Sequence, residues 1–367
     1  MDIKQVEWIN SSDLPPFFRD EVLGPAAHVT KRYFRTAKGQ LDPARVKMAT
    51  PFVVSIVGTG KRGIGVSIAL SYAKAGASGI LLSSRTEASL KHVAEQVKAI
   101  NPSCRVEYQV CDVCIEDDLV RLASRCKECF GRLDVAVLNQ SDLPRLIQNE
   151  DGSLHFPYGL YEETREDVSN IWGTNYHGSY LAIEALLPLI RVSVDGPQSI
   201  VMLSSIGALS SETSPTTCTA SYITSKFAIT RLAEFVHNEF KSDGVLCFAI
   251  HPGCIKINDD FPIPWDFLID DVSLPGGFCV WLTKMKRAWL SGRFLVSGWD
   301  VTELESQKER IVAEDKFKFR LVPSPRFEPT FLSPWFPSTL VLNTCSKTLS
   351  SWLKTKDFSR FQAKNRG

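Results

Sequence analysis

The chain has 367 residues, of which 44% are hydrophobic and 23% charged, values typical of a globular protein with a sizeable core. Its net charge of +1 gives no global sign of binding to nucleic acid or to an anionic membrane surface. The most apolar stretches, such as Ala182–Ile190, are too short to span a bilayer, and the first twenty residues lack the pattern of a signal peptide. We therefore expect a cytoplasmic protein without a membrane span.

The two ends of the chain differ from its middle. Residues 1–50 hold scattered aromatic residues without clear periodicity, and we expect an N-terminal extension that wraps the core or hangs from it. Residues 316–367 carry ten Lys and Arg residues against two acids, and five prolines follow from position 323. We expect residues 314–367 to form a basic C-terminal extension that is solvated, with contact to phosphate or to a membrane surface as the alternative.

Between these extensions, residues 51–313 alternate short apolar runs with amphipathic helical stretches, for example Gly65–Ala75, Glu87–Ala99 and Asp117–Phe130. Such alternation predicts a parallel sheet with helices on both faces. The fold class is therefore α/β, a single doubly wound Rossmann-type domain with a seven-stranded sheet. The predicted strands are Phe52–Val57, Gly79–Leu82, Val106–Val110, Leu133–Leu138, Ser199–Leu203, Val245–Ile250 and Arg293–Val296.

A glycine-rich loop follows the first predicted strand. Residues 58–65 read G-T-G-K-R-G-I-G and lead directly into a helix. Glycines at such a place permit a tight turn and a close approach of backbone to a pyrophosphate, whose charge is favoured at the helix N-terminus. The pattern predicts a dinucleotide site that includes Gly58, Gly60, Gly63, Ile64 and Gly65.

Charges near this loop favour NADP(H) over NAD(H). An NAD site usually places Asp or Glu after the second strand, where the carboxylate accepts a hydrogen bond from the ribose 2′-hydroxyl. Here that place reads Ser83-Ser84-Arg85, and Arg62 precedes Gly63 in the loop. Each arginine taken alone is equally compatible with an ordinary surface residue. Together they can bind a 2′-phosphate through charge-assisted hydrogen bonds.

Polar residues in three later segments form a candidate catalytic set. Tyr222 and Lys226 begin a predicted helix and, being four residues apart, share one of its faces. This spacing is common in any helix, but here a nucleotide loop precedes it and the tripeptide His251-Pro252-Gly253 follows it. Two further residues come from the segment W-G-T-N-Y-H-G and from the end of a strand. The full set is Asn175, Ser205, Tyr222 and Lys226.

Over about residues 50–310 these motifs resemble the short-chain dehydrogenase/reductase family, and the chain end from Gly292 to Val301 is similar to fungal members of secondary metabolism. The resemblance implies that the four residues above are the catalytic tetrad. It also implies that Asp112 lies near the adenine of the cofactor, that Asn139 belongs to the segment after the fourth strand, and that Pro252-Gly253 flanks the nicotinamide. The chain departs from the family pattern at Thr59, Gln140, Ser141, Met202 and Ile257.

The activity that the resemblance implies is hydride transfer between NADP(H) and a CH–OH group, which interconverts a ketone and a secondary alcohol. Tyr222 would donate or accept the proton, because the ammonium of Lys226 and the positive nicotinamide favour the phenolate form of a phenol. Ser205 would hydrogen-bond the substrate oxygen, and Lys226 would also hold the nicotinamide ribose. Asn175 would support a water molecule that relays protons.

The substrate and the partners are less closely defined. Residues 258–285, where the family has its substrate-binding segment, are rich in apolar and aromatic residues, which suits a small lipophilic carbonyl or alcohol or else simple packing on the core. The Ser/Thr-rich stretch Ser210–Thr219 is expected to border the same pocket. The alternatives are a catalytically weak NADP-binding scaffold, suggested by the departures, or a dehydratase or epimerase on the same fold. A homodimer or a homotetramer is possible on the sequence alone, which does not decide between them.

Two C-x-x-C pairs imitate the spacing of a zinc site, namely Cys111 with Cys114 and Cys126 with Cys129. Cys111 closes a strand-like run, and Cys126 shares a helical face with apolar residues. Small buried hydrophobic side chains explain both positions. We therefore expect reduced thiols and no bound metal.

Overall fold

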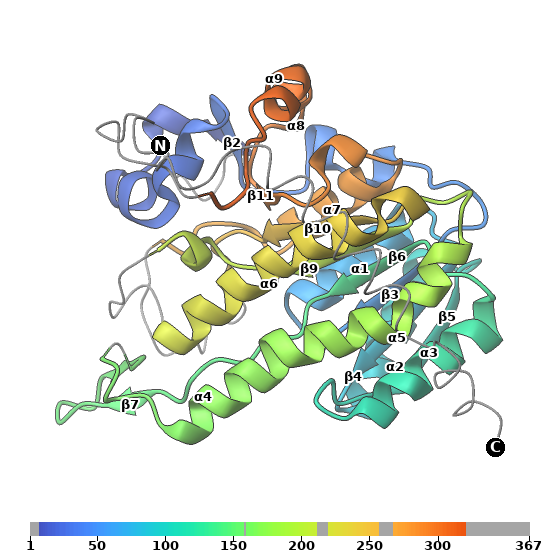
Figure 1. Cartoon of the computed structure of the whole chain (residues 1–367), viewed down its shortest axis with the longest axis horizontal. Helices are drawn as coiled ribbons and strands as arrows, with labels where there is room; N and C mark the ends of the chain where they lie inside the picture. Colours follow the sequence, from blue (N-terminus) through green and yellow to red (C-terminus); the bar gives the residue numbers. More distant parts are fainter. Residues whose placement is uncertain (1–6, 158, 211–218, 257–266, 321–367) are drawn as a thin grey trace, which may run out of the picture. The chain divides into compact units, whose positions relative to one another are not determined.

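The computed structural model describes residues 7–157, 159–210, 219–256 and 267–320 (Figure 1). Its main sheet has seven parallel strands in the order β11-β10-β9-β6-β3-β4-β5, so the strand order reverses between β3 and β6. The α/β, doubly wound prediction is confirmed, and all seven predicted strands occur. Their bounds are β3 Val53–Val57, β4 Gly79–Ser84, β5 Arg105–Val110, β6 Val135–Leu138, β9 Ser199–Leu203, β10 Leu246–His251 and β11 Phe294–Val296.

Two groups of helices flank this sheet (Figure 1). In the first group α1 packs against α2 and α7, and in the second α3 packs against α5. Helices cover both faces of the sheet, so its central strands are buried and mostly apolar: every residue of β6 is at most 2% exposed. The helices are α1 Ile64–Lys74, α2 Glu87–Ile100, α3 Glu116–Phe130, α5 Gly178–Val192, α6 Ala220–Phe240 and α7 Leu274–Thr283.

The helix that ends in α5 contains a wide turn. It begins as α4 (Arg165–Trp172), where Thr164 Oγ1 accepts a hydrogen bond from Asp167 N at 3.0 Å, and it passes through the π-helical turn Gly173–His177. Such turns insert one extra residue per turn and occur often at functional sites. This one contains Asn175, whose side chain it directs into the interior, where the residue is 0% exposed.

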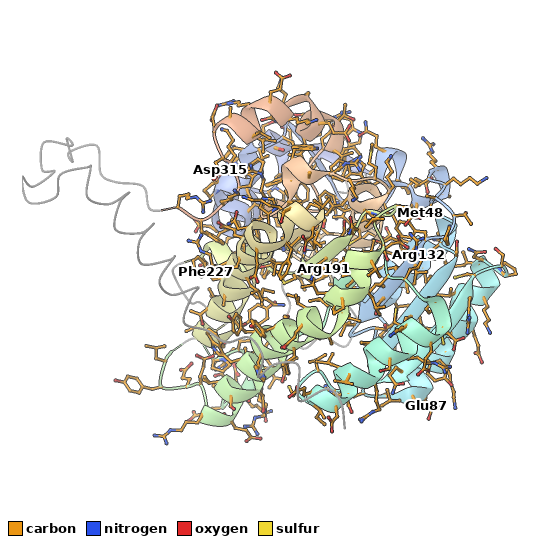
Figure 2. All side chains as sticks on the ribbon, turned by 45° about the vertical axis from the view of Figure 1, so that its right-hand side comes forward. Met48, Glu87, Arg132, Arg191, Phe227 and Asp315 are labelled. Atoms are coloured by element: carbon orange, nitrogen blue, oxygen red, sulfur yellow. The ribbon has the colours of Figure 1, made fainter. Side chains whose placement is uncertain are left out.

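The segment before β3 packs on the sheet domain. Strands β1 (Trp8–Asn10) and β2 (Arg32–Phe34) form an antiparallel pair, and Phe34 N donates to Gly298 O at 2.7 Å beyond β11. Phe18 is 1% exposed. Met48 N donates to Ala75 O at 2.9 Å, at the end of α1 (Figure 2). Residues 7–50 therefore share a core with the Rossmann-type domain.

The remaining elements are short. Strands β7 (Ile147–Gln148) and β8 (Leu154–His155) pair with each other, and helices α8 (Val301–Ser306) and α9 (Lys308–Ala313) follow β11. Within the described ranges, no helix combines the length and apolarity needed to cross a membrane. Several sequence expectations lie outside the described residues: Ile257, residues 258–266 of the substrate segment, residues 211–218 of the Ser/Thr-rich stretch, and the C-terminal extension from residue 321.

The cysteine pairs are free thiols. Cys111 and Cys126 are buried, as predicted, and Cys114 is exposed. Burial raises the pKa of the Cys111 and Cys126 thiols to about 12, so both stay protonated at neutral pH. In the part of the chain that the structure describes, no group of three or more His, Cys, Asp or Glu residues is placed to hold a metal ion.

Candidate active site

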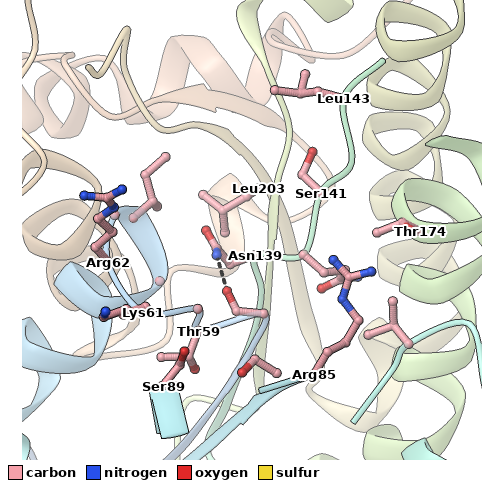
Figure 3. Close-up of a pocket in the computed structure, with 18 of the residues that line it drawn as sticks. Thr59, Lys61, Arg62, Arg85, Ser89, Asn139, Ser141, Leu143, Thr174 and Leu203 are labelled. Carbon is pink, nitrogen blue, oxygen red and sulfur yellow. Dashed lines mark hydrogen bonds between the residues drawn. The ribbon is translucent and has the colours of Figure 1, made fainter. Parts of the chain in front are cut away.

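A cavity of about 490 Å³ opens at the carboxyl ends of β3, β4, β5, β6 and β9 (Figure 3). Ligands of doubly wound sheets bind outside the carboxyl ends of the strands, where the strand order reverses, and the cavity lies at that point. Twelve of the sequence-predicted site residues line it: Gly58, Gly60, Arg62, Gly63, Ile64, Gly65, Arg85, Asp112, Asn139, Tyr222, Lys226 and Pro252. Three do not line it: Asn175, Ser205 and Gly253.

The glycine-rich loop turns sharply after β3. Gly58 N and Thr59 N both donate to Ser83 O, at 2.9 and 2.8 Å. Gly58 has φ +82°, and a Cβ atom there would lie 2.6 Å from Gln140 N, so only glycine fits. Thr59, the first departure from the family pattern, is 1% exposed and donates its hydroxyl to Ile56 O at 3.1 Å. Its hydroxyl group is thus used inside the turn.

Basic groups surround the loop. Among the described lining residues there are four cationic side chains and one acid, Asp112, whose Oδ1 accepts a hydrogen bond from Cys114 N at 3.0 Å. Gly63 is the N-cap of α1 and supplies no side chain to cap the free N–H groups of the first turn. Figure 3 shows Lys61 and Arg62 on one side of the cavity and Arg85 on the other. This combination suits an elongated anionic ligand.

The residues after β6 join the loop to the long helix. Asn139 Nδ2 donates to Gly58 O at 2.6 Å (Figure 3). Gln140, a further departure, donates from Nε2 to Ser179 Oγ at 2.9 Å, and Ser179 Oγ donates to Asn175 O at 2.6 Å. The larger side chain at position 140 therefore ties the end of β6 to the π-helical turn.

The buried side chain of Asn175 connects the segment after β6 to helix α6 through hydrogen bonds. Its Oδ1 accepts from Asp142 N at 2.7 Å, and its Nδ2 donates to Asp142 O at 3.2 Å and to Ser225 Oγ at 3.0 Å. Ser225 Oγ in turn donates to Tyr222 O at 2.7 Å. The Asn175 side chain thus connects the segment after β6 to α6, one turn from Tyr222.

Tyr222 and Lys226 come from the first two turns of α6. Thr219 caps this helix by accepting from Tyr222 N at 3.4 Å, and the carboxylate of Glu163 accepts from Ser221 N and Ser221 Oγ. Lys226 is 2% exposed, and its Nζ lies 5.5 Å from the centroid of the Tyr222 ring. The i, i+4 spacing in the sequence therefore brings an ammonium and a phenol together at the cavity.

Ser205 begins the loop after β9 and borders the site without lining the cavity. Its Oγ accepts from Gly207 N at 3.2 Å, and the neighbouring Ile206 N donates to His251 Nδ1 at 3.1 Å. Burial lowers the pKa of His251 to about 3, so the ring is neutral at physiological pH and Nδ1 remains an acceptor. His251 therefore fixes the loop that carries Ser205.

Several lining residues were absent from the sequence-derived set. Lys61 and Ser84 adjoin predicted residues, and their place in the motif is a signal that could have found them. Ser89 lies in the first turn of α2, directly after the second strand, where a polar residue can reach a phosphate. Thr174 adjoins the predicted Asn175 in the same way, whereas Leu143 carries no such local signal, because tertiary packing alone brings its segment to the cavity.

Comparison with known proteins establishes the family. The sequence profile of the short chain dehydrogenases matches residues 53–260, more than half of the chain. Short chain dehydrogenase pgmD of Aspergillus terreus is 33% identical over 291 residues, which cover 77% of this chain and 90% of that protein. Short chain dehydrogenase mpl6 of Monascus purpureus is 34% identical and covers 73% of this chain and 88% of its own length.

A solved structure shares the fold. A 3-oxoacyl-[acyl-carrier protein] reductase from Brucella melitensis with bound NAD matches with a TM-score of 0.56 and 21% identity, over 71% of this chain and 94% of that one. The chain belongs to the short-chain dehydrogenase family, whose members are oxidoreductases that act on CH–OH groups with a nicotinamide cofactor.

Proposed function

We propose that this chain is an NADP(H)-dependent oxidoreductase that interconverts a ketone and a secondary alcohol on a small lipophilic metabolite. In this proposal Tyr222 donates or accepts the proton. One observation carries it: Tyr222 and Lys226 line the same cavity as the glycine-rich loop and Arg85. A proton-transferring pair and a site for a dinucleotide therefore face one space, which hydride transfer with coupled proton transfer requires.

The residues present fit a nicotinamide dinucleotide phosphate. The uncapped N-terminus of α1 and the backbone of the loop suit a pyrophosphate. Arg62, Arg85 and Lys61 are exposed at the cavity, and the residue directly after β4 is Arg85 instead of an acid. Exposed side chains change rotamer within nanoseconds, so Arg62 and Arg85 can both turn toward a 2′-phosphate from their two sides. These features support NADP(H) over NAD(H).

When bound, the cofactor supplies or accepts the hydride. The chain's own residues then have separate tasks. Lys226 presents a desolvated ammonium to the phenol of Tyr222, which favours phenolate and eases proton exchange near neutral pH. Ser205 hydrogen-bonds the substrate oxygen as negative charge develops. Asn175 acts through its buried hydrogen bonds, which hold α6 and the segment after β6 in register.

The substrate class rests on two supports. Phe267 and Leu268 are the first described residues of the predicted substrate segment, and both are half-buried. The ring centroids of Phe267 and Phe17 lie 6.1 Å apart. Neither Phe267 nor Leu268 lines the cavity, and the support comes from the apolar, aromatic composition of the segment to which they belong. The similarity to dehydrogenases of Aspergillus and Monascus supports a role in fungal secondary metabolism. Neither the scaffold nor the dehydratase or epimerase alternative has a structural observation of its own in its favour.

Cofactor titration tests the proposal. We expect the unmodified chain to bind NADPH more tightly than NADH and to oxidise NADPH with at least one ketone of a lipophilic panel. Arg85→Asp should abolish the preference, since it replaces a cation at the 2′-phosphate by an anion. Arg45→Asp is the matched control, because Arg45 has a 73% exposed side chain in the N-terminal segment. Equal affinity of the unmodified chain for the two cofactors would contradict the NADP(H) assignment.

Self-association is the remaining part of the proposal. Trp172, Phe227 and Phe235 are exposed on α4 and α6, at 37, 41 and 65%. Figure 2 labels Phe227. Exposed aromatic residues gathered on neighbouring helices are typical of a protein–protein interface. We expect a homodimer or homotetramer, and analytical ultracentrifugation of Phe235→Glu against the unmodified chain tests it. A monomer at micromolar concentration in the unmodified chain would refute self-association.

A further inference from the structure

A buried carboxylate lies against the turn that follows β10. The side chain of Asp270 is 0% exposed, and its Oδ2 accepts a hydrogen bond from Cys254 N at 2.7 Å. The backbone repeats this connection, because Asp270 N donates to Cys254 O at 2.9 Å. Residue 270 is thereby fastened to the chain directly after Pro252-Gly253, and Pro252 lines the cavity.

The carboxylate also contacts the turn itself. Gly253 has φ +111°, and a Cβ atom there would lie 3.0 Å from Asp270 Oδ2 and 3.3 Å from Leu274 Cδ2. The turn therefore has one side at the cavity and the other side against Asp270. A small shift of this carboxylate would move the backbone that lines the cavity.

Two residues of the N-terminal segment hold Asp270. Tyr33, in β2, donates from its hydroxyl to Asp270 Oδ2 at 3.0 Å across 237 positions of sequence. Its ring is 1% exposed and lies edge-on to Phe18, with 5.7 Å between ring centroids. Arg35 brings its Nε to 3.9 Å from Asp270 Oδ1, and its side chain is 4% exposed.

Arg35 is costly where it lies. Its Nε and Nη1 are buried without a hydrogen-bond partner. A buried cation so poorly satisfied usually destabilises a fold, and replacing such groups by apolar ones is often neutral or stabilising. The benefit therefore has to be sought in what the charge does to Asp270, the carboxylate with which it forms an ion pair.

We propose that Tyr33 and Arg35 of the N-terminal segment are positioning residues of the cofactor site, which act by holding Asp270 against the Pro252-Gly253 turn. The inference rests on the proposed function, since it takes the turn to contact the nicotinamide end of the cofactor. It gives residues 7–50 a role beyond covering the core. Strand β2 would set the wall of a cavity that it does not itself line.

The charge of Asp270 supplies a specific readout. The pKa of Asp270 is raised to about 7: burial is the main cause and Asp271 also raises it, whereas the Cys254 N–H, the Tyr33 hydroxyl and Arg35 each lower it. Tyr33 stays neutral, because burial raises its pKa well above the ordinary value. His251, which lies 3.9 Å from Cys254 Sγ, is also neutral. Of Asp270, Tyr33 and His251, only Asp270 therefore changes charge near neutral pH. Its ionised form accepts stronger hydrogen bonds than its protonated form does.

The test measures the dissociation constant of NADPH between pH 5.5 and 8.5 for the unmodified chain and for Tyr33→Phe. The matched control is Tyr72→Phe, which also removes a buried hydroxyl group. This hydroxyl forms a hydrogen bond of 2.8 Å with Thr283 Oγ1 and does not contact the Pro252-Gly253 turn. The 2′-phosphate itself titrates near pH 6, so the comparison between variants, rather than the single curve, is diagnostic. Asp270→Asn provides the variant in which no titration at position 270 is left.

For Tyr33→Phe we expect NADPH binding about 3- to 10-fold weaker at pH 7.5, the range for one lost buried hydrogen bond, and a titration midpoint moved to higher pH. Tyr72→Phe should match the unmodified chain in both respects, and Asp270→Asn should lose the step near pH 7. If Tyr33→Phe and Tyr72→Phe gave the same affinity and midpoint, the inference would be overturned while the proposed function stood. If the unmodified chain bound neither NADPH nor NADH, the proposed function would fail and this inference with it.

Discussion

Replacement of Lys226 by Met keeps the length of a buried side chain and removes its charge. The ammonium lies 5.5 Å from the centroid of the Tyr222 ring. If the distance to the ring is taken as the order of the charge separation, with an effective dielectric constant of about 20, the attraction between ammonium and phenolate is about 3 kcal/mol. Such a difference corresponds to about 10²-fold in the ionisation of the phenol. We therefore expect Lys226→Met to lower kcat/KM by about 10²-fold at pH 7 and to weaken cofactor binding as well.

Stability separates this effect from damage to the fold. Lys226 is 2% exposed, and its Nζ donates a hydrogen bond to Leu203 O at 2.9 Å. Because a desolvated ammonium is expensive to bury, Lys226→Met should melt at the same temperature as the unmodified chain or higher. The assay is NADPH oxidation with an accepted ketone, and Lys286→Met, which loses a hydrogen bond to Gln198 Oε1 instead, is the control. A rate within 3-fold of the unmodified enzyme would refute the assigned role of Lys226.

Two further predictions concern buried polar groups. Asn175→Ala should lower the free energy of unfolding by about 2–4 kcal/mol, because Asp142 N and Asp142 O lose their partner and Ser225 Oγ loses a donor, and urea unfolding measures this. A loss below about 0.5 kcal/mol would contradict the connecting role of Asn175. The folded-state pKa of Asp270 is about 7, against an ordinary value of 3.8. The protonated carboxyl group therefore contributes to stability, fully so below about pH 4. This contribution, at most about 4 kcal/mol, is lost as the pH rises through 7. Asp270→Asn should therefore flatten the decline of stability between about pH 4 and pH 7, and an unchanged decline would count against the raised pKa.

Local patterns in the sequence predicted much of the fold. Apolar runs between amphipathic stretches marked all seven strands, since a parallel sheet covered by helices needs strands that are apolar on both sides. The ends of the strands differ from the prediction by one or two residues: β4 continues to Ser84, beyond the predicted Leu82, and β6 begins at Val135 instead of Leu133. The first and last residues of a strand depend on pairing with the neighbouring strand, and the sequence of one segment alone does not encode this pairing.

The same distinction between local patterns and long-range contacts applies to the candidate site. The glycine-rich loop and the Tyr222–Lys226 pair could be located because their function depends on spacing within a few residues. The hydrogen bond from Gln140 to Ser179 and the contact of Tyr33 with Asp270 depend on segments 39 and 237 positions apart, and nothing in either local sequence indicates the partner. Sequence reasoning consequently left the N-terminal segment without an assigned contact.

The most direct test of the proposed chemistry is the turnover of Tyr222→Phe with NADPH and an accepted ketone. The change keeps the ring at the cavity and removes the hydroxyl group alone. Cofactor affinity should stay within about 2-fold, because the loop and the basic residues hold the phosphates, whereas kcat should fall by about 10²-fold or more, as expected for loss of a general acid. Ser205→Ala should likewise reduce kcat with little effect on cofactor binding. A Tyr222→Phe enzyme that retained most of its turnover would contradict the assignment of Tyr222 as the proton donor.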